Sequence, residues 1–336
     1  MHVCNRSVLS SSRLTLGLLT IALGSVLASP AFAADKDIKG WYGTLDLALT
    51  QPNSLDQHFA DEVDPATAST NRLVIDNDKD FTWRVDVGYS FGKGLGSLQV
   101  SYWSFDNEDK QEGTSGGNLY PSIFGYSSQI GYGMYLSAPP ASFQATGKVK
   151  ARTVDLDYIR PIQVGEKFTV KWLAGYRTAR YEEDLNLAAA DGNGTYYQGR
   201  HQEATANGLR VGVTGVFGFT KHFSIEAGMA ASFMQAKTEG DSTETFNGFV
   251  TGTATRQGSD DHVTGEIRDY DFRAVWNYGH IDYFLGYDVS EWDGLVVNPV
   301  PLAVNGFQGS IGSSDRSSVS FNSFHGGVTI RYGKPK

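Results

Sequence analysis

Two acidic clusters in the chain carry residue types suited to acid–base chemistry. Their members are Asp76, Asp78 and Asp80 in the segment DNDKD, and Asp260, Asp261 and His262 in the segment SDDH. Paired carboxylates hold a water molecule and a histidine accepts its proton, which would suit hydrolysis if the fold brought the clusters together. Hydrated acidic loops are the simpler interpretation, because short matches of this kind arise often by chance.

The first cluster is also spaced like the start of a calcium-binding loop, but Phe81 stands where such a loop requires glycine. We therefore expect no metal site, no cofactor and no catalytic residue. Whether the two clusters are hydrated loops or parts of one site depends on the fold that carries them.

Composition indicates what those elements are. Only 40% of the residues are hydrophobic and the mean hydropathy is -0.29. Beyond the N-terminal region, no segment reaches the roughly 18 apolar residues of a membrane-spanning helix. The 39 glycines, 17 tyrosines and 19 phenylalanines are typical of a β protein.

The segment 1–34 has the features of a secretory signal peptide. Two arginines precede the apolar run Leu14–Ala28, and the small residues after it form an A-x-A cleavage site. The alternative is an uncleaved anchor helix, which the short apolar run disfavours. The single cysteine, Cys4, would leave with the signal. The mature chain 35–336 would keep 26 basic and 37 acidic residues, which argues against nucleic acid as a partner.

Ten segments of the mature chain alternate between apolar and polar residues, as strands with two different faces do. They are 41–50, 81–91, 97–105, 149–159, 168–181, 208–219, 223–234, 267–278, 281–289 and 320–332. The short connections are 92–96, 160–167, 220–222 and the turn around Gly279, and they alternate with long ones at 51–80, 106–148, 182–207, 235–266 and 290–319. Every long connection would therefore lie at one end of the strands.

This pattern predicts an all-β fold, a transmembrane up-and-down antiparallel β-barrel of about ten strands in the outer membrane of a Gram-negative bacterium, with short periplasmic turns and long extracellular loops. In the segment Asp80–Gly92, Trp83 and Val85 would face lipid while Arg84 and Asp86 would face the lumen. The alternative is a secreted soluble β-sandwich or propeller. A sandwich gives no reason to collect the long loops at one end or to bury charged residues. We expect the mature chain to form a single domain.

The same alternation directs fifteen charged side chains into the lumen, where we expect them to line a pore. They are Asp46, Arg84, Asp86, Asp155, Asp157, Lys171, Arg177, Arg210, Glu226, Asp269, Asp271, Arg273, Asp282, Asp288 and Arg331. Inward glycines such as Gly88 and Gly175 would leave space along the wall. The nine acids outnumber the six bases by three, which predicts a mild preference for cations. Arg273 and Asp282 would lie diagonally across a hairpin and form a hydrogen bond.

A plugged structural or adhesive barrel is the alternative to a pore. Ten strands enclose only slightly more space than side chains can fill, so the inward charges would then pair off in a closed lumen. Segments 118–143 and 294–307 are too apolar for freely solvated loops. They would fold into the mouth, pack on each other, or contact a partner or a second copy of the chain.

Four segments of the mature chain resemble the pore-forming outer-membrane proteins related to the Legionella major outer membrane protein. They are GWYGTLDLAL (40–49), VDLDYIRPIQVGEKFTVKWLAGYRTARYEEDL (154–185), LRVGVTGVFGFTKHFSIEAGMAASFM (209–234) and the terminal strand FHGGVTIRYGKPK (324–336). The resemblance covers essentially the whole mature chain. It implies a porin-like protein that lets small solutes or ions pass.

The terminal strand also resembles the signal that the barrel-assembly machinery recognises, although such chains usually end on the aromatic residue and Tyr332 here is followed by four others. The two acidic clusters are similar in placement to the catalytic groups of omptin proteases, so a surface protease is a further alternative. Expected partners are outer-membrane lipid and lipopolysaccharide, the assembly machinery, and small solutes or ions. The sequence does not decide whether the chain forms a homo-oligomer.

Overall fold

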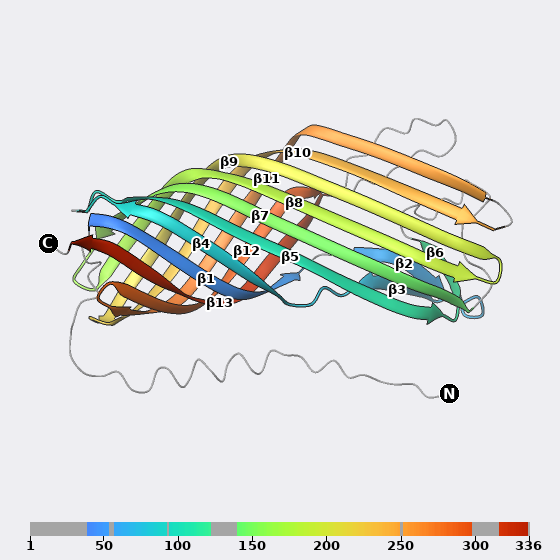
Figure 1. Cartoon of the computed structure of the whole chain (residues 1–336), viewed down its shortest axis with the longest axis horizontal. Coiled ribbons are helices and arrows are strands. Elements are labelled where there is room, and N and C mark those ends of the chain that lie inside the picture. The colour runs from blue at the N-terminus through green and yellow to red at the C-terminus, as the bar shows by residue number, and fades with distance from the viewer. Residues whose placement is uncertain are drawn as a thin grey trace.

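The computed structural model describes residues 39–53, 57–92, 94–121, 140–248, 251–297 and 316–334, which form strands almost throughout (Figure 1). The signal peptide expected at 1–34 lies outside these residues. Within the described part of the chain, no helix has the length and apolarity to cross a membrane.

Ten of the described strands pair side by side into a closed antiparallel barrel (Figure 1). Their bounds are β1 (Lys39–Asn53), β4 (Asp80–Ser90), β5 (Ser97–Ser115), β7 (Ala141–Gln163), β8 (Phe168–Asp191), β9 (Gly194–Thr220), β10 (Phe223–Asn247), β11 (Thr251–Tyr278), β12 (Ile281–Val297) and β13 (Arg316–Lys334). The order around the ring is β1-β13-β12-β11-β10-β9-β8-β7-β5-β4. Each predicted strand overlaps one of these ten, so the predicted barrel class is confirmed.

The short connections lie together at one end, which is the left end in Figure 1. In the turn between β11 and β12, Gly279 adopts φ 78°, a conformation that residues with a side chain rarely take. The barrel closes where β13 pairs with β1, with Tyr332 opposite Trp41 and Val328 opposite Leu45. The terminal strand β13 therefore forms the closing seam of the barrel with β1.

At the opposite end the strands run further than the sequence predicted. The segment 182–207, expected as a loop, continues β8 and β9 up to a tight turn. In this turn the Asp191 carboxylate accepts the backbone N–H groups of Asn193 and Gly194 at 2.7 and 2.9 Å. β10 and β11 likewise occupy most of 235–266. The prediction of long loops in these two places was wrong.

The reason is a change of phase in the alternation. Along β8, Tyr181, Leu185 and Leu187 are buried on the inner face, while Arg180 and Glu182 lie on the outer face. The apolar face therefore switches from the outside to the inside of the barrel as the strand leaves the membrane, because its outer surface then contacts water. A strand predicted from one continuous alternation of apolar and polar residues therefore ends too early, at the point where the apolar face changes sides.

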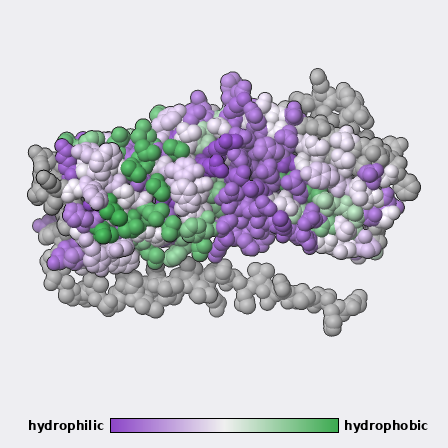
Figure 2. Space-filling model, in the orientation of Figure 1, coloured by the Kyte–Doolittle hydropathy of each residue, from purple (hydrophilic) through white to green (hydrophobic). Residues whose placement is uncertain are grey.

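The outer face of the barrel is divided into belts. Exposed apolar side chains such as Leu45, Val87 and Leu156 gather over the end with the short turns, and a strongly hydrophilic belt lies beside them (Figure 2). In the segment 80–90, Trp83 and Val87 are exposed while Thr82 is buried. The apolar face of this strand therefore contacts lipid, as predicted.

A second, three-stranded sheet covers part of the inner wall at the far end. It consists of β2 (Gln57–Val63), β3 (Thr70–Ile75) and β6 (Asn118–Pro121), in the order β3-β2-β6. Phe59 and Leu119 are fully buried and cluster with Leu187 of the barrel wall. The described ends of the segment 118–143 thus pack into the barrel mouth, as one of the open alternatives proposed, and residues 122–139 lie outside the description. For the segment 294–307, residues 298–307 also lie outside it.

Candidate functional site in the barrel lumen

The structure places all fifteen predicted charged side chains on the inner face of the barrel. Thirteen of them line one cavity of about 530 Å³. The other two are buried beside it: Arg177 pairs with Asp155, which lines the cavity, and Asp46 contacts His325. The cavity begins at the periplasmic turns, where Gly94 and Gln163 border it, and reaches Asp155 in the middle of the barrel. We call this space the vestibule.

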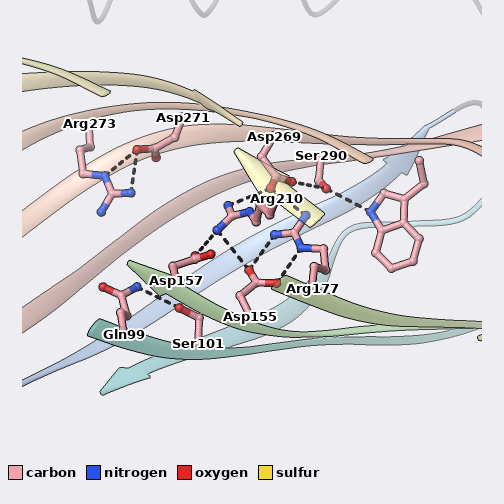
Figure 3. Close-up of polar contacts among 11 residues, drawn as sticks. Gln99, Ser101, Asp155, Asp157, Arg177, Arg210, Asp269, Asp271, Arg273 and Ser290 are labelled. Atoms are coloured by element: carbon pink, nitrogen blue, oxygen red, sulfur yellow. Dashed lines mark hydrogen bonds and ion pairs between the residues drawn. The ribbon is translucent and has the colours of Figure 1, made fainter. Parts of the chain in front are cut away.

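Five of these charges form a network that spans the lumen (Figure 3). Arg177 of β8 donates from Nε and Nη2 to the two carboxylate oxygens of Asp155 at 2.6 and 2.7 Å. Its Nη1 atom also lies 2.8 Å from Asp269 of β11, three strands away around the ring. Arg210 of β9 contacts the same Asp269 at 3.1 Å and pairs with Asp157. We call these five residues the cross-lumen network.

A glycine on β8 makes room for part of this network. Gly175 lies directly opposite Asp157 on one neighbouring strand and opposite Arg210 on the other. A Cβ atom at this position would collide with Asp157 Oδ1. Because Gly175 has no side chain, the carboxylate and the guanidinium meet in front of the strand between them.

His325, which the count of acidic and basic residues did not include, connects three strands, one of which, β11, also carries Asp269 of the cross-lumen network. His325 of β13 is 2% exposed and its Nδ1 atom lies 2.8 Å from Asp46 of β1. Its Nε2 atom lies 3.4 Å from Asp271 of β11, which also accepts a hydrogen bond of 2.8 Å from Arg273 Nε. The sequence did contain a signal for the inward position of His325. It lies six residues before Arg331, and an even spacing places two residues of a strand on the same face.

The vestibule contains both paired and unpaired charges. Lys171 of β8 and Glu226 of β10 form an ion pair of 3.2 Å along its wall, in front of β9. Arg84 and Asp288 line it without a hydrogen bond or ion pair to any described residue. The vestibule is therefore a hollow space lined by charges of both signs, some joined in ion pairs and others, such as Arg84 and Asp288, interacting over longer distances.

One predicted pair does not form. Asp282 accepts hydrogen bonds from Arg331 and from Asn277, whereas Arg273 binds Asp271 instead. The hairpin register explains the error, because Asn277 lies opposite Asp282 and Arg273 lies opposite Gly286. The prediction of an Arg273–Asp282 hydrogen bond was wrong.

Next to the cross-lumen network, on the side away from the vestibule, aromatic rings meet inside the barrel. We call them the aromatic layer, and they are Trp103 and Phe105 of β5, Trp292 of β12 and Phe321 of β13. The centroids of Trp103 and Phe321 lie 5.4 Å apart, although β4 and β1 separate their strands in the ring. These rings belong to a buried apolar cluster with members from eight barrel strands. At this level the lumen is filled by side chains.

The two acidic clusters that opened the sequence analysis make local contacts. Asp78 donates its backbone N–H to Asp109 Oδ2 at 2.9 Å. Asp260 Oδ1 accepts the backbone N–H of His262 at 2.9 Å, and Asp261 lies 3.8 Å from Lys237. Among the described residues, no contact joins the two clusters, and no group of three or more His, Cys, Asp or Glu side chains is arranged to hold a metal ion.

A closed antiparallel barrel with an apolar outer belt and a charged interior defines an outer-membrane β-barrel protein. The sequence belongs to the family described as the Legionella pneumophila major outer membrane protein precursor, which it matches over residues 38–289. The family resemblance predicted from the sequence is thereby confirmed, and so is the location in a Gram-negative outer membrane. A search of curated proteins finds no significant match.

Solved structures of other outer-membrane barrels are similar at low identity. The outer-membrane protease OmpT of Escherichia coli is 12% identical with a TM-score of 0.49, and the match covers 87% of this chain and 97% of OmpT. The toluene transporter TbuX of Ralstonia pickettii is 9% identical with a TM-score of 0.26 and coverages of 91% and 96%. The Pseudomonas putida toluene transporter TodX is 7% identical with a TM-score of 0.30 and coverages of 87% and 90%. Likenesses this weak say nothing about activity.

Proposed function

We propose that the protein is a gated outer-membrane pore for small ions and solutes, and that the structure is its closed conformation. The vestibule carries this proposal. It is a hollow space of about 530 Å³ lined by charged side chains, and it leads from the periplasmic turns to the cross-lumen network. Charged groups inside a barrel are more stable where water reaches them, so the proposal requires water in this half of the lumen. The proposal assigns no catalytic step to the chain.

The gate in this proposal consists of the cross-lumen network and the aromatic layer. Both are held by non-covalent contacts between strands that are not neighbours in the ring, such as Arg177 with Asp269 and Trp103 with Phe321. Side chains at such contacts can move while the backbone ladder of the barrel stays intact. Opening therefore requires rearrangement of side chains, and the barrel wall itself can remain unchanged.

The charge of the lumen supports a preference for cations. Nine inward carboxyl groups face six inward arginine and lysine side chains, and protonation of His325 would reduce the excess of acid from three to two. Asp288 lines the vestibule and forms no hydrogen bond or ion pair with a described residue, although the positive charge of Arg84 lies close enough to act on it. A negatively charged path concentrates cations and repels anions.

Recordings from purified protein in a planar bilayer test this function. We expect discrete conductance steps with a low open probability, and a zero-current potential across a KCl gradient whose sign shows preference for potassium. The preference should weaken as the salt concentration passes roughly 0.1 M, where the screening length is about 10 Å. A chloride preference would contradict the cation path, and silence at every voltage would contradict the pore.

The aromatic layer favours a second candidate, a sealed structural barrel. Apolar side chains from eight strands fill the lumen at this level, and buried aromatic contacts of this kind stabilise a protein interior. A sealed barrel would conduct nothing at any voltage. It would also tolerate the loss of the vestibule charges without a change in function.

A further inference from the structure

The outer wall of the barrel carries two arginines directly opposite each other at the border of the apolar belt. Arg152 of β7 and Arg180 of β8 are paired residues in the ladder, and both side chains are exposed. Towards the periplasmic end, the next outward residues of β7 are Val154 and Leu156, which are 46% and 48% exposed. The apolar belt thus begins one step below Arg152, and Figure 2 shows a strongly hydrophilic belt beside it.

The two guanidinium groups are not compensated equally. Like charges directly opposite each other on neighbouring strands are unfavourable. Arg180 has ion pairs with Glu182 at 2.8 Å and Glu203 at 3.0 Å. Arg152 has no hydrogen bond or ion pair to any described residue. On its other side, Ser104 of β5 lies directly opposite and supplies a hydroxyl group. Arg152 is therefore the arginine of this pair that has no counter-ion among the described residues, and an anion bound there would supply one.

We propose that Arg152, together with Arg180, binds a phosphate group of lipopolysaccharide in the outer leaflet. A guanidinium group binds phosphate through two parallel hydrogen bonds, which makes arginine better suited than lysine to this contact. The acyl chains of the same molecule would lie along Val154 and Leu156, which continue the outer face of β7 into the membrane. Both chemical parts of an anionic lipid are thus matched on one strand. The inference depends on the outer-membrane location and not on the proposed pore.

The chain offers a matched control on the same strand. Arg160 lies on the same outward face of β7 as Arg152 and is also exposed, but at the periplasmic end, beyond Val154 and Leu156. Arg152→Gln and Arg160→Gln therefore remove the same charge from the two ends of one apolar segment. Only the first substitution should affect binding of a lipid of the outer leaflet.

The experiment measures binding of purified lipopolysaccharide to the detergent-solubilised barrel. Arg152→Gln should lower the affinity about tenfold, which corresponds to the loss of one charge-assisted contact. Arg160→Gln should bind like the wild type. Without lipopolysaccharide, Arg152→Gln should unfold at the same temperature as the wild type or above it, because the like-charge contact is gone. This readout also shows that the variant is folded.

Three results of the lipopolysaccharide measurements would overturn the proposal, and a fourth comes from competition with free phosphate. The three are unchanged affinity in Arg152→Gln, an equal loss in Arg160→Gln, and equally tight binding of lipopolysaccharide whose phosphates have been removed. Millimolar inorganic phosphate provides a further arm of the experiment. If free phosphate displaces lipopolysaccharide, the site is one for a small anion and the lipid assignment is wrong. If it does not, the contact with the acyl chains is part of recognition, as proposed.

Discussion

Trp103 of β5 and Trp292 of β12 pack against each other inside the barrel, with ring centroids 6.4 Å apart. The indole N–H of Trp292 donates to Ser290 Oγ at 3.0 Å, and this hydroxyl donates to Asp269 Oδ1 at 2.8 Å. Asp269 is also the carboxylate that Arg177 and Arg210 share. The aromatic layer and the cross-lumen network are therefore connected, and a movement in one layer has to disturb the other.

Removing the central base of the network should destabilise the barrel strongly. Arg177→Met leaves Asp155 and Asp269 buried with one cation fewer, and breaking a buried ion pair on one side costs about 3–5 kcal/mol. Urea refolding titrations measure the change. Arg268→Gln is the control, because Arg268 pairs with Glu266 on the outer face in contact with solvent. Equal midpoints for the two variants would contradict the role given to the network.

The assignment of inside and outside predicts opposite tolerance for a new arginine. Val85→Arg places a charge on the lipid-facing side and should cost about 2–4 kcal/mol. Thr44→Arg introduces the same side chain into the vestibule, opposite Asp86, and should be mild. Gly88 is a poor choice for the inner site, because a Cβ atom there would collide with the ring of Tyr42. Similar losses in refolding titrations for the two arginine variants would reverse the assignment.

A histidine outside the membrane-spanning part predicts a pH effect. The hydrogen bond between His201 Nδ1 and Asp184 Oδ1, 2.6 Å long, raises the pKa of His201 above its usual value of about 6.5. The stabilisation by this pair is therefore fully present below about pH 6.5 and is lost as the pH rises through the raised pKa. Asp184→Asn should lower the pKa of His201, as an NMR titration of its ring would show. An unchanged pKa in this variant would refute the assignment.

The sequence was sufficient for the barrel and for the inner position of its charges. The period of two places Asp155, Asp157 and Arg177 on inward positions once a single residue of each strand has been assigned to a face. Partners across the lumen could not be predicted in the same way. Arg177 meets Asp269 only because the ring closes and brings β8 and β11 to face each other. The alternation within a strand contains no information on which residues of distant strands face each other across the lumen.

The aromatic layer was missed for a different reason. Apolar residues were expected on the lipid side, yet Trp103 lies on the inward face of β5 in phase with Gln99 and Ser101. Phe321 is likewise in phase with His325 on β13. Their spacing from inward polar residues indicated the inner face, but their apolar side chains suggested the lipid-facing side. Inward apolar residues near the end of a predicted strand are therefore a signal for a closed lumen.

The most direct test of the closed lumen compares the conductance of wild-type protein with that of Trp103→Ala/Phe321→Ala in planar bilayers. Trp83→Ala serves as the control, because Trp83 lies on the outer face and is 40% exposed. Each loss of a large aromatic side chain from a packed interior costs about 3–5 kcal/mol, so folding of the double variant has to be verified by its heat-dependent shift in gel mobility. The proposed gate predicts rare openings for the wild type and the control, and frequent or permanent openings for the double variant. Equal open probability in all three proteins would contradict a gate formed by the aromatic layer.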